Sequence, residues 1–221
     1  MRVVVFGASG MVGGGALREC LEDARVDEVI SVGRRPCGLS HPKLKEIQAP
    51  DLFDLGPFAE QLTGLDACFY CIGVTSAGMS EADYRRVTHD LTVAVFDVLL
   101  AANPDLKICF VSGAGTDGTE KGRVMWARVK GAAENHLLAR SENAYMFRPG
   151  FIQPMKGVRS ATAMYQAVYT VLGPLYPVLR RLFPGGVTTS VAVGQAMINA
   201  VTRGSPKRIL ETRDINALAG A

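Results

Sequence analysis

The chain has 221 residues, 48% of them hydrophobic, which is enough to bury the core of one domain with at most a small appendage. Its formal net charge of +3, with no block rich in lysine or arginine, argues against a nucleic-acid partner. The longest apolar stretch, Met164 to Pro184, is interrupted by glycine, proline and arginine, which argues against a membrane span.

Predicted strands and helices alternate along the first two thirds of the chain. Strands are expected at Arg2–Phe6, Glu28–Val32, Leu44–Gln48, Ala67–Ile72, Lys107–Ser112 and Ala144–Phe147. Helices are expected at Met11–Glu22, Gly56–Leu62, Ser80–Ala102 and Lys121–Ser141, the third opening with a capping box. The fourth and fifth strands are almost wholly apolar, as a sheet covered on both faces requires. This order predicts an α/β protein with a doubly wound parallel sheet, the Rossmann fold.

A glycine-rich turn follows the first strand and opens the first helix, in the order strand, turn, helix that binds the phosphates of a dinucleotide. Gly7 permits the tight turn, Gly10 lets backbone N–H groups approach the pyrophosphate, and Gly13 lets the helix pack against the strand. The spacing is GxxGxxG, not the GxGxxG of ordinary dehydrogenases. The predicted cofactor-binding residues of the turn are Gly7, Ser9, Gly10, Met11, Val12 and Gly13.

The end of the second strand indicates which dinucleotide is bound. An NAD enzyme usually places an acid there to bind the ribose hydroxyls, but this chain has Arg34 and Arg35 instead. Two guanidinium groups match a 2′-phosphate in charge and geometry, so NADP(H) is preferred over NAD(H); the alternative is a solvated basic loop. Asp51 and Leu52 would sit beside the adenine, unless Asp51 is an ordinary turn acid. The backbone of Cys71, Ile72 and Gly73 would pass the ribose and pyrophosphate.

After Pro149 the alternation of strands and helices fails, and 72 residues remain. We therefore expect residues 1–155 to form the dinucleotide-binding core. Residues 156–221 are expected to form a small, mostly helical C-terminal lid that folds over the carboxyl ends of the strands and binds the substrate. Its apolar segment Met164–Tyr176 could line a pocket or form the seam of a homodimer.

Together with the glycine turn, three further features resemble the short-chain dehydrogenase/reductase superfamily: Ser112-Gly113-Ala114 after the fifth strand, Lys130, and Arg148-Pro149-Gly150. The chain is most similar to the atypical short members, of the Tat-interacting-protein-like and NmrA-like kind, strongly over residues 1–155 and weakly in the tail. There, the segment that starts at Val187 resembles the beginning of the closing helix of extended members. The resemblance implies that Ser112 orients a carbonyl, that Lys130 binds the nicotinamide ribose, and that Arg148, Pro149 and Gly150 adjoin the cofactor.

The sequence departs from the family pattern at the catalytic tyrosine, whose position is held by Trp126. An indole N–H can donate a hydrogen bond but has no usable acidity, and loss of a positioned acid typically costs about 10²–10⁴-fold in rate. Possible substitutes are Tyr84, Thr75 and Ser76, each more easily explained as core or loop residues. The three histidines, His41, His89 and His136, are expected in a turn or on helix surfaces, and no side chains show the spacing of a metal site.

Two functions from different classes remain open. One is an NADP(H)-dependent oxidoreductase that acts on a small carbonyl substrate; the other is a non-catalytic NADP(H)-binding sensor that contacts a regulatory protein partner. A nucleotide-sugar epimerase or dehydratase is disfavoured, because that chemistry depends on the missing tyrosine and the tail is short. Of the five cysteines, Cys68 and Cys71 should lie on opposite faces of a strand, which argues against a redox pair. Reduced thiols of this kind predict a cytoplasmic location.

Overall fold

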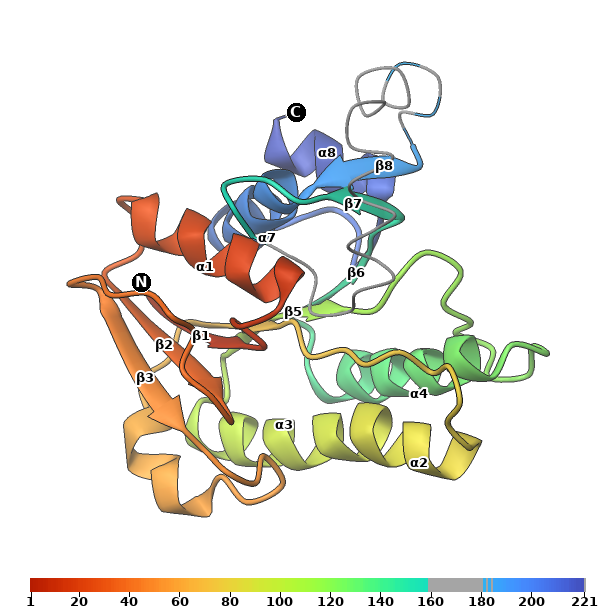
Figure 1. Ribbon diagram of the computed structural model, residues 1–221, viewed down its shortest axis with the longest axis horizontal. Helices are drawn as coiled ribbons and strands as arrows, with labels where there is room; N and C mark the ends of the chain where they lie inside the picture. The colour runs from red at the N-terminus through yellow and green to blue at the C-terminus, as the bar shows by residue number, and fades with distance from the viewer. Residues whose placement is uncertain (159–180, 182, 184, 221) are drawn as a thin grey trace.

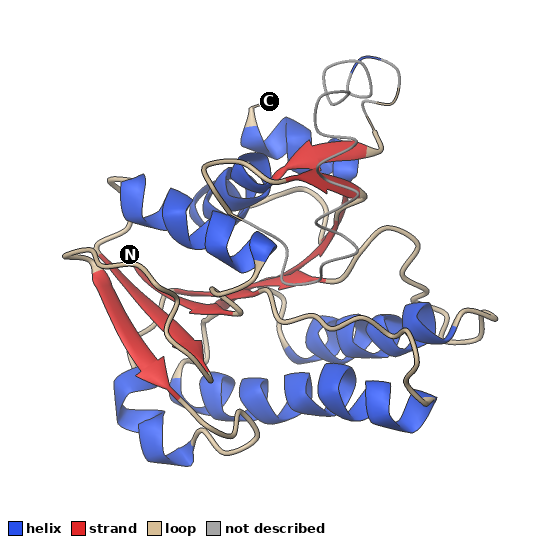
Figure 2. Cartoon of the chain, viewed as in Figure 1, coloured by secondary structure: helices blue, strands red, loops and turns tan. Residues whose placement is uncertain are grey.

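The computed structural model describes residues 1–158, 181, 183 and 185–220. A parallel sheet lies between two layers of helices, as Figure 1 shows, and Figure 2 separates the layers by colour. The predicted seam at Met164–Tyr176 lies outside the described residues.

Seven strands form the main sheet in the order β3-β2-β1-β4-β5-β6-β9, and every pair is parallel. The order reverses between β1 and β4, which creates the crevice where doubly wound sheets bind ligands. The doubly wound Rossmann sheet predicted from the sequence is therefore confirmed. The strands are β1 Arg2–Phe6, β2 Glu28–Gly33, β3 Leu44–Gln48, β4 Ala67–Tyr70, β5 Lys107–Val111, β6 Ala144–Arg148 and β9 Ile209–Glu211.

Successive residues of each strand enter opposite cores. Val3 and Val5 of β1 lie in the core beneath α1 (Met11–Glu22) and α7 (Ser190–Arg203). Val4 and Phe6 lie in the core on α3 (Leu91–Ala102), α4 (Met125–Arg140) and the 3₁₀ helix η1 (Gly56–Leu62). Both faces are therefore buried, which explains why the central strands carry no alternation of apolar and polar residues.

The long helix predicted at Ser80–Ala102 is present but not regular. It begins as α2 (Glu81–Arg85), passes through one π-helical turn, η2 (Arg86–Asp90), and continues as α3. Ser80 caps its start, because its Oγ accepts a hydrogen bond from the backbone N–H of Asp83 at 3.1 Å. The helix that follows β5 begins at Met125, four residues later than predicted.

The tail differs most from expectation. Helix α7 packs on the sheet and against α1, so it covers the core instead of the carboxyl ends of the strands. The tail also contains strands: β9 adds a seventh strand beside β6, and β8 (Val187–Thr189) pairs with β7 (Phe151–Gln153). These strands have three residues each, too short for periodicity to reveal. The last helix, α8 (Thr212–Ala219), follows β9 directly.

Candidate functional site

The glycine turn lies at the point where the strand order reverses. Gly7 has a φ of +80°, and a Cβ there would lie 2.7 Å from the carbonyl oxygen of Cys71, directly after β4. A Cβ on Gly13 would lie 2.2 Å from the carbonyl oxygen of Gly7. Turn, helix and neighbouring strand therefore touch through backbone atoms alone, which only glycine permits.

The first turn of α1 has the features of an anion site. Gly10 is the N-cap of the helix, and no side chain caps the helix start. The N–H groups of Met11, Val12 and Gly13 have no intrahelical acceptor at this position, and the positive end of the helix dipole lies with them. The N–H of Gly10 donates to the carbonyl oxygen of Gly7 at 2.9 Å, so the N–H groups left for an anion are those of Met11, Val12 and Gly13. Ser9, beside it, is exposed.

Basic and acidic groups flank this turn on the β2 and β3 side. Arg34 and Arg35 follow β2 and are exposed, and neither has an ion pair within the described part of the chain. Asp51, after β3, is exposed and accepts a hydrogen bond from the N–H of Phe53 at 2.9 Å, the pattern of an ordinary turn acid. Leu52 packs against the core next to it, as does Ile72 after β4, while Gly73 is exposed.

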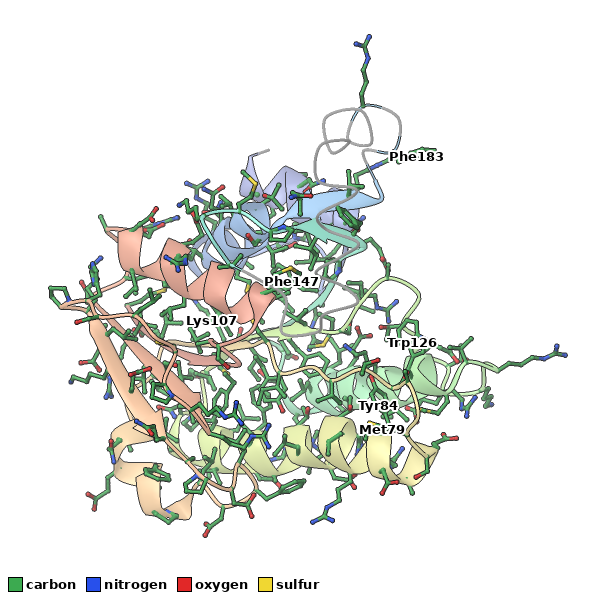
Figure 3. All side chains as sticks on the ribbon, viewed as in Figure 1. Met79, Tyr84, Lys107, Trp126, Phe147 and Phe183 are labelled. Carbon is green, nitrogen blue, oxygen red and sulfur yellow. The ribbon has the colours of Figure 1, made fainter. Side chains whose placement is uncertain are left out.

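A second group of side chains lies where β5 ends and α4 begins. Trp126, Lys130 and Glu134 occupy successive turns of α4. A Cβ on Gly115 would lie 3.7 Å from the indole ring of Trp126, so the ring lies against the loop that follows β5. Figure 3 shows Trp126 at the amino-terminal end of α4. Lys130 Nζ donates to the backbone carbonyl of Ser112 at 2.5 Å. Removal of the Lys130 ammonium from water lowers its pKa to about 8, although the Glu134 carboxylate opposes the shift.

Glu134, which the sequence interpretation missed, is the centre of a buried polar network. Its side chain has no exposed surface, and its oxygens accept hydrogen bonds from Ser112 Oγ at 2.5 Å and from Arg148 at 2.5 and 3.0 Å. The Ser112 hydroxyl therefore donates its hydrogen bond to Glu134 and not to a ligand. The predicted hydrogen bond from Ser112 to a carbonyl would require its release from Glu134.

The segment Arg148–Gly150 holds elements together. The Arg148 guanidinium forms an ion pair with Glu134, and Glu211 of β9 lies 3.5 Å away. The hydrogen bond and charge of Glu134 raise the pKa of Arg148 further above its ordinary value. The carbonyl of Pro149 accepts from Ala114 at 2.9 Å, and the N–H of Gly150 donates to a threonine of α8 at 2.8 Å.

The other candidate acids do not converge on this group. Tyr84 of α2 is 1% exposed and buried, and Figure 3 shows it below Trp126 in the layer of α2 and α4. Thr75 Oγ1 accepts from a backbone N–H of its own loop at 3.3 Å, and Ser76 adjoins it. His89 and His136 pack edge to face with ring centres 6.0 Å apart, and the His89 side chain is only partly exposed. His41 is exposed in its turn.

All five cysteines are free thiols. Cys68 lies in the core on the α3 side and Cys71 packs against the opposite core, which confirms that the pair is split across the sheet. Burial raises the pKa of Cys71 to about 12 and raises that of Cys20, Cys68 and Cys109 as well, so these thiols are unreactive. Within the described residues, no group of histidine, cysteine and carboxylate side chains could hold a metal ion.

Proteins with similar sequences include two of Aspergillus, and no protein-family model matches the chain. The protein named fmp52-2, mitochondrial, of Aspergillus oryzae is 28% identical over 151 residues, which cover 67% of this chain and 66% of that protein. The protein named fmp52, mitochondrial, of Aspergillus clavatus is 27% identical over 207 residues, which cover 90% and 86%. These names overturn the cytoplasmic location expected from the cysteines, because reduced, buried thiols do not distinguish between compartments. Among the described residues, none forms a helix long and apolar enough to cross a membrane.

Several solved structures with the same fold are of enzymes in complex with NAD. The enzyme WbmF of Bordetella bronchiseptica, in complex with NAD+, superposes with a TM-score of 0.69 at 15% identity, over 98% of this chain and 76% of that chain. A double mutant of DesIV, a dTDP-glucose 4,6-dehydratase of Streptomyces venezuelae with NAD bound, gives 0.68 at 15%, over 99% and 80%. Reductases are among the further matches. The chain therefore has the Rossmann fold that its glycine turn and its alternating strands and helices predicted.

Proposed function

We propose that the protein is an NADP(H)-dependent oxidoreductase that acts on a small carbonyl substrate. The observation that carries the proposal is the uncapped first turn of α1 at the reversal of strand order, cradled by Gly7 and Gly13. This turn offers backbone donors and a helix dipole to a pyrophosphate. The cofactor would supply the hydride, and the residues at the carboxyl ends of the strands would bind and orient both ligands.

Preference for NADP(H) rests on Arg34 and Arg35. They follow β2, where the adenosine ribose lies in proteins of this fold, and no acid stands with them to bind a free 2′-hydroxyl. Because both side chains are exposed and have no ion pair among the described residues, they are available to a 2′-phosphate.

Catalysis is favoured over sensing by the group at the end of β5. The Lys130 ammonium donates a hydrogen bond to the carbonyl oxygen of Ser112, whose hydroxyl donates to the buried Glu134. A lysine whose pKa is lowered to about 8, and which adjoins a buried carboxylate, is typical of a catalytic site. Nucleotide-sugar chemistry is disfavoured by Trp126, because that chemistry depends on the tyrosine that Trp126 replaces. The names of the two Aspergillus relatives support a mitochondrial location.

The cofactor proposal is tested by calorimetric titration of the protein with NADPH and NADH. Replacing both Arg34 and Arg35 with alanine should weaken NADPH binding by at least about 100-fold, since each charge-assisted hydrogen bond contributes roughly 1.5–3 kcal/mol, and should leave NADH binding nearly unchanged. Arg203→Ala, an exposed arginine at the end of α7, is the matched control and should change neither affinity.

Equal losses for the two cofactors in the double variant would contradict the preference for NADP(H). Failure of the folded wild-type protein to bind either cofactor would overturn the oxidoreductase proposal altogether.

A further inference from the structure

We propose that Lys130 Nζ is itself the proton donor to the substrate carbonyl, in the place that a tyrosine holds in active members of the superfamily. This inference rests on the proposed function and adds to it the identity of the acid.

Helix α4 presents one chemically distinct side chain in each of three successive turns. Trp126 stands against the loop after β5, Lys130 reaches the last residue of the predicted strand, Ser112, and Glu134 lies behind both in the core. Lys130 lies one helical turn after Trp126, the position of the missing tyrosine. Its side chain is partly exposed, unlike that of Glu134.

The neighbours of Lys130 cannot supply the proton. Ser112 has a single hydroxyl proton, which it donates to Glu134 at 2.5 Å. Arg148 donates to the same carboxylate, and a guanidinium does not release a proton in a protein. Trp126 has no usable acidity. The Lys130 ammonium carries three protons, and the structure gives one of them to the Ser112 carbonyl.

Most charged and titratable groups of α2, η2, α3 and β6, the elements packed against α4, form hydrogen bonds or ion pairs with other residues. Glu134 is the charged group that acts on Lys130, and its negative charge favours the ammonium form. Further pairs are Glu81 of α2 with Arg128, Asp83 of α2 with Ser80, Arg85 of α2 with Asp90, Arg86 of η2 with the Phe53 ring, His89 of η2 with Asp90 and His136, Asp97 of α3 with Arg140, and Arg148 of β6 with Glu134 and Glu211. Tyr84 of α2 is buried.

The proposed step balances without a further reactant. The carbonyl carbon receives a hydride from NADPH, which becomes NADP+, and the carbonyl oxygen receives a proton from Lys130 Nζ, which gives the alcohol and a neutral amine. The amine regains its proton from water. With a pKa of about 8, Lys130 is protonated at neutral pH yet acidic enough to transfer the proton, which is the condition that general-acid catalysis favours.

The inference is tested first on the unaltered protein. The rate kcat for NADPH-dependent reduction, over a panel of aldehydes, ketones and quinones, should fall about tenfold per pH unit above about pH 8, because the neutral amine has lost the proton that the step requires. Competitive acetylation of the lysines, measured by mass spectrometry without substrate, should give Lys130 a pKa well below that of an ordinary lysine.

Lys130→Arg then separates proton transfer from binding, because arginine keeps the charge but not the acidity. It should lower kcat by about 10²–10⁴-fold and remove the inflection near pH 8, while NADPH affinity by calorimetry stays within about tenfold. Lys107→Arg is the matched control: Lys107 also donates to a backbone carbonyl, that of Val201 at 2.7 Å, but lies at the opposite end of β5 (Figure 3). It should change neither kcat nor affinity.

The outcomes separate the two proposals. If the protein binds NADPH, three results would overturn the role of Lys130 and leave cofactor binding intact. These are turnover that survives in Lys130→Arg, a wild-type kcat that does not change between pH 7 and 9.5, and no wild-type turnover on the panel. An ordinary pKa for Lys130 by acetylation also overturns it. Absence of binding by both cofactors overturns the proposed function instead.

Discussion

At the carboxyl edge of the sheet, the polar groups near β1 and β2 are exposed, whereas those near β5 and β6 are buried. At the ends of β1 and β2, the first turn of α1 is uncapped and Arg34 and Arg35 are exposed. At the ends of β5 and β6, Ser112 and Glu134 are buried and bonded to protein partners. The half proposed to bind phosphates therefore keeps its groups in water, whereas the half proposed to do chemistry keeps them in a closed internal network.

Solvation explains the difference. An exposed guanidinium is hydrated at little cost and can exchange water for a phosphate when a ligand arrives. A buried carboxylate must have partners in the free protein as well, because an unpaired charge in the core costs several kcal/mol. The comparison teaches that sequence motifs identify the exposed half directly, while the buried half is defined by pairings between distant residues.

The largest expected effect is the loss of stability when the buried ion pair between Glu134 and Arg148 is removed. Glu134→Ala leaves Arg148 without its buried partner and should lower the free energy of unfolding by about 3–5 kcal/mol, measured by urea denaturation. Glu211→Gln is the matched control on the same arginine. Since the Glu211 side chain is 51% exposed and 3.5 Å from Arg148, its loss should cost about 1 kcal/mol or less. Equal costs would mean that burial does not distinguish the two halves.

The second prediction concerns the open half. A Cβ on Gly10 would meet only the carbonyl oxygen of Gly7, at 3.3 Å, so Gly10→Val should fold but fill the space that a pyrophosphate needs. Affinity for both cofactors should fall by at least about 100-fold, which corresponds to roughly 2.7 kcal/mol. Circular dichroism checks the fold and calorimetry the binding; retained affinity would show that the turn serves packing alone. Gly13→Val, by contrast, should not fold, because its Cβ would lie 2.2 Å from the same oxygen.

The smallest expected effect concerns an ion pair at the amino end of β2, on the edge of the sheet opposite both halves. Glu28 of β2 binds Arg2 and Lys45, and these hydrogen bonds lower the pKa of its carboxyl below the ordinary value of 4.5. Its stabilising contribution is therefore present above pH 4.5 and is lost as the pH falls through the lower, folded-state pKa. Glu28→Gln should flatten this acid limb in urea denaturation curves, and an unchanged limb would assign it to other carboxyl groups.

Much of the fold and of the cofactor half could be predicted, because the signals are local. Buried strands such as Arg2–Phe6 are apolar runs, and Gly7, Gly10 and Gly13 all lie within seven consecutive residues. The capping function of Ser80 is likewise set by its near neighbours.

The rest depends on contacts that no short window contains. Glu134 looks like a solvated helix charge until β6 brings Arg148 beside it, and the one available signal was its place one turn after Lys130 among small residues. The π-helical turn at Arg86–Asp90 and the late start of α4 follow from tertiary packing and from the loop around Asp117, whose carboxylate binds the N–H groups of Thr119 and Gly122.

The position of β9 has a consequence for how the chain is made. During synthesis β6 is complete at Arg148, but its outer neighbour does not exist until Ile209–Glu211 have been translated. Throughout that interval the nascent sheet presents a bare hydrogen-bonding edge next to an apolar core, the kind of surface that chaperones shield and that pairs wrongly with other chains.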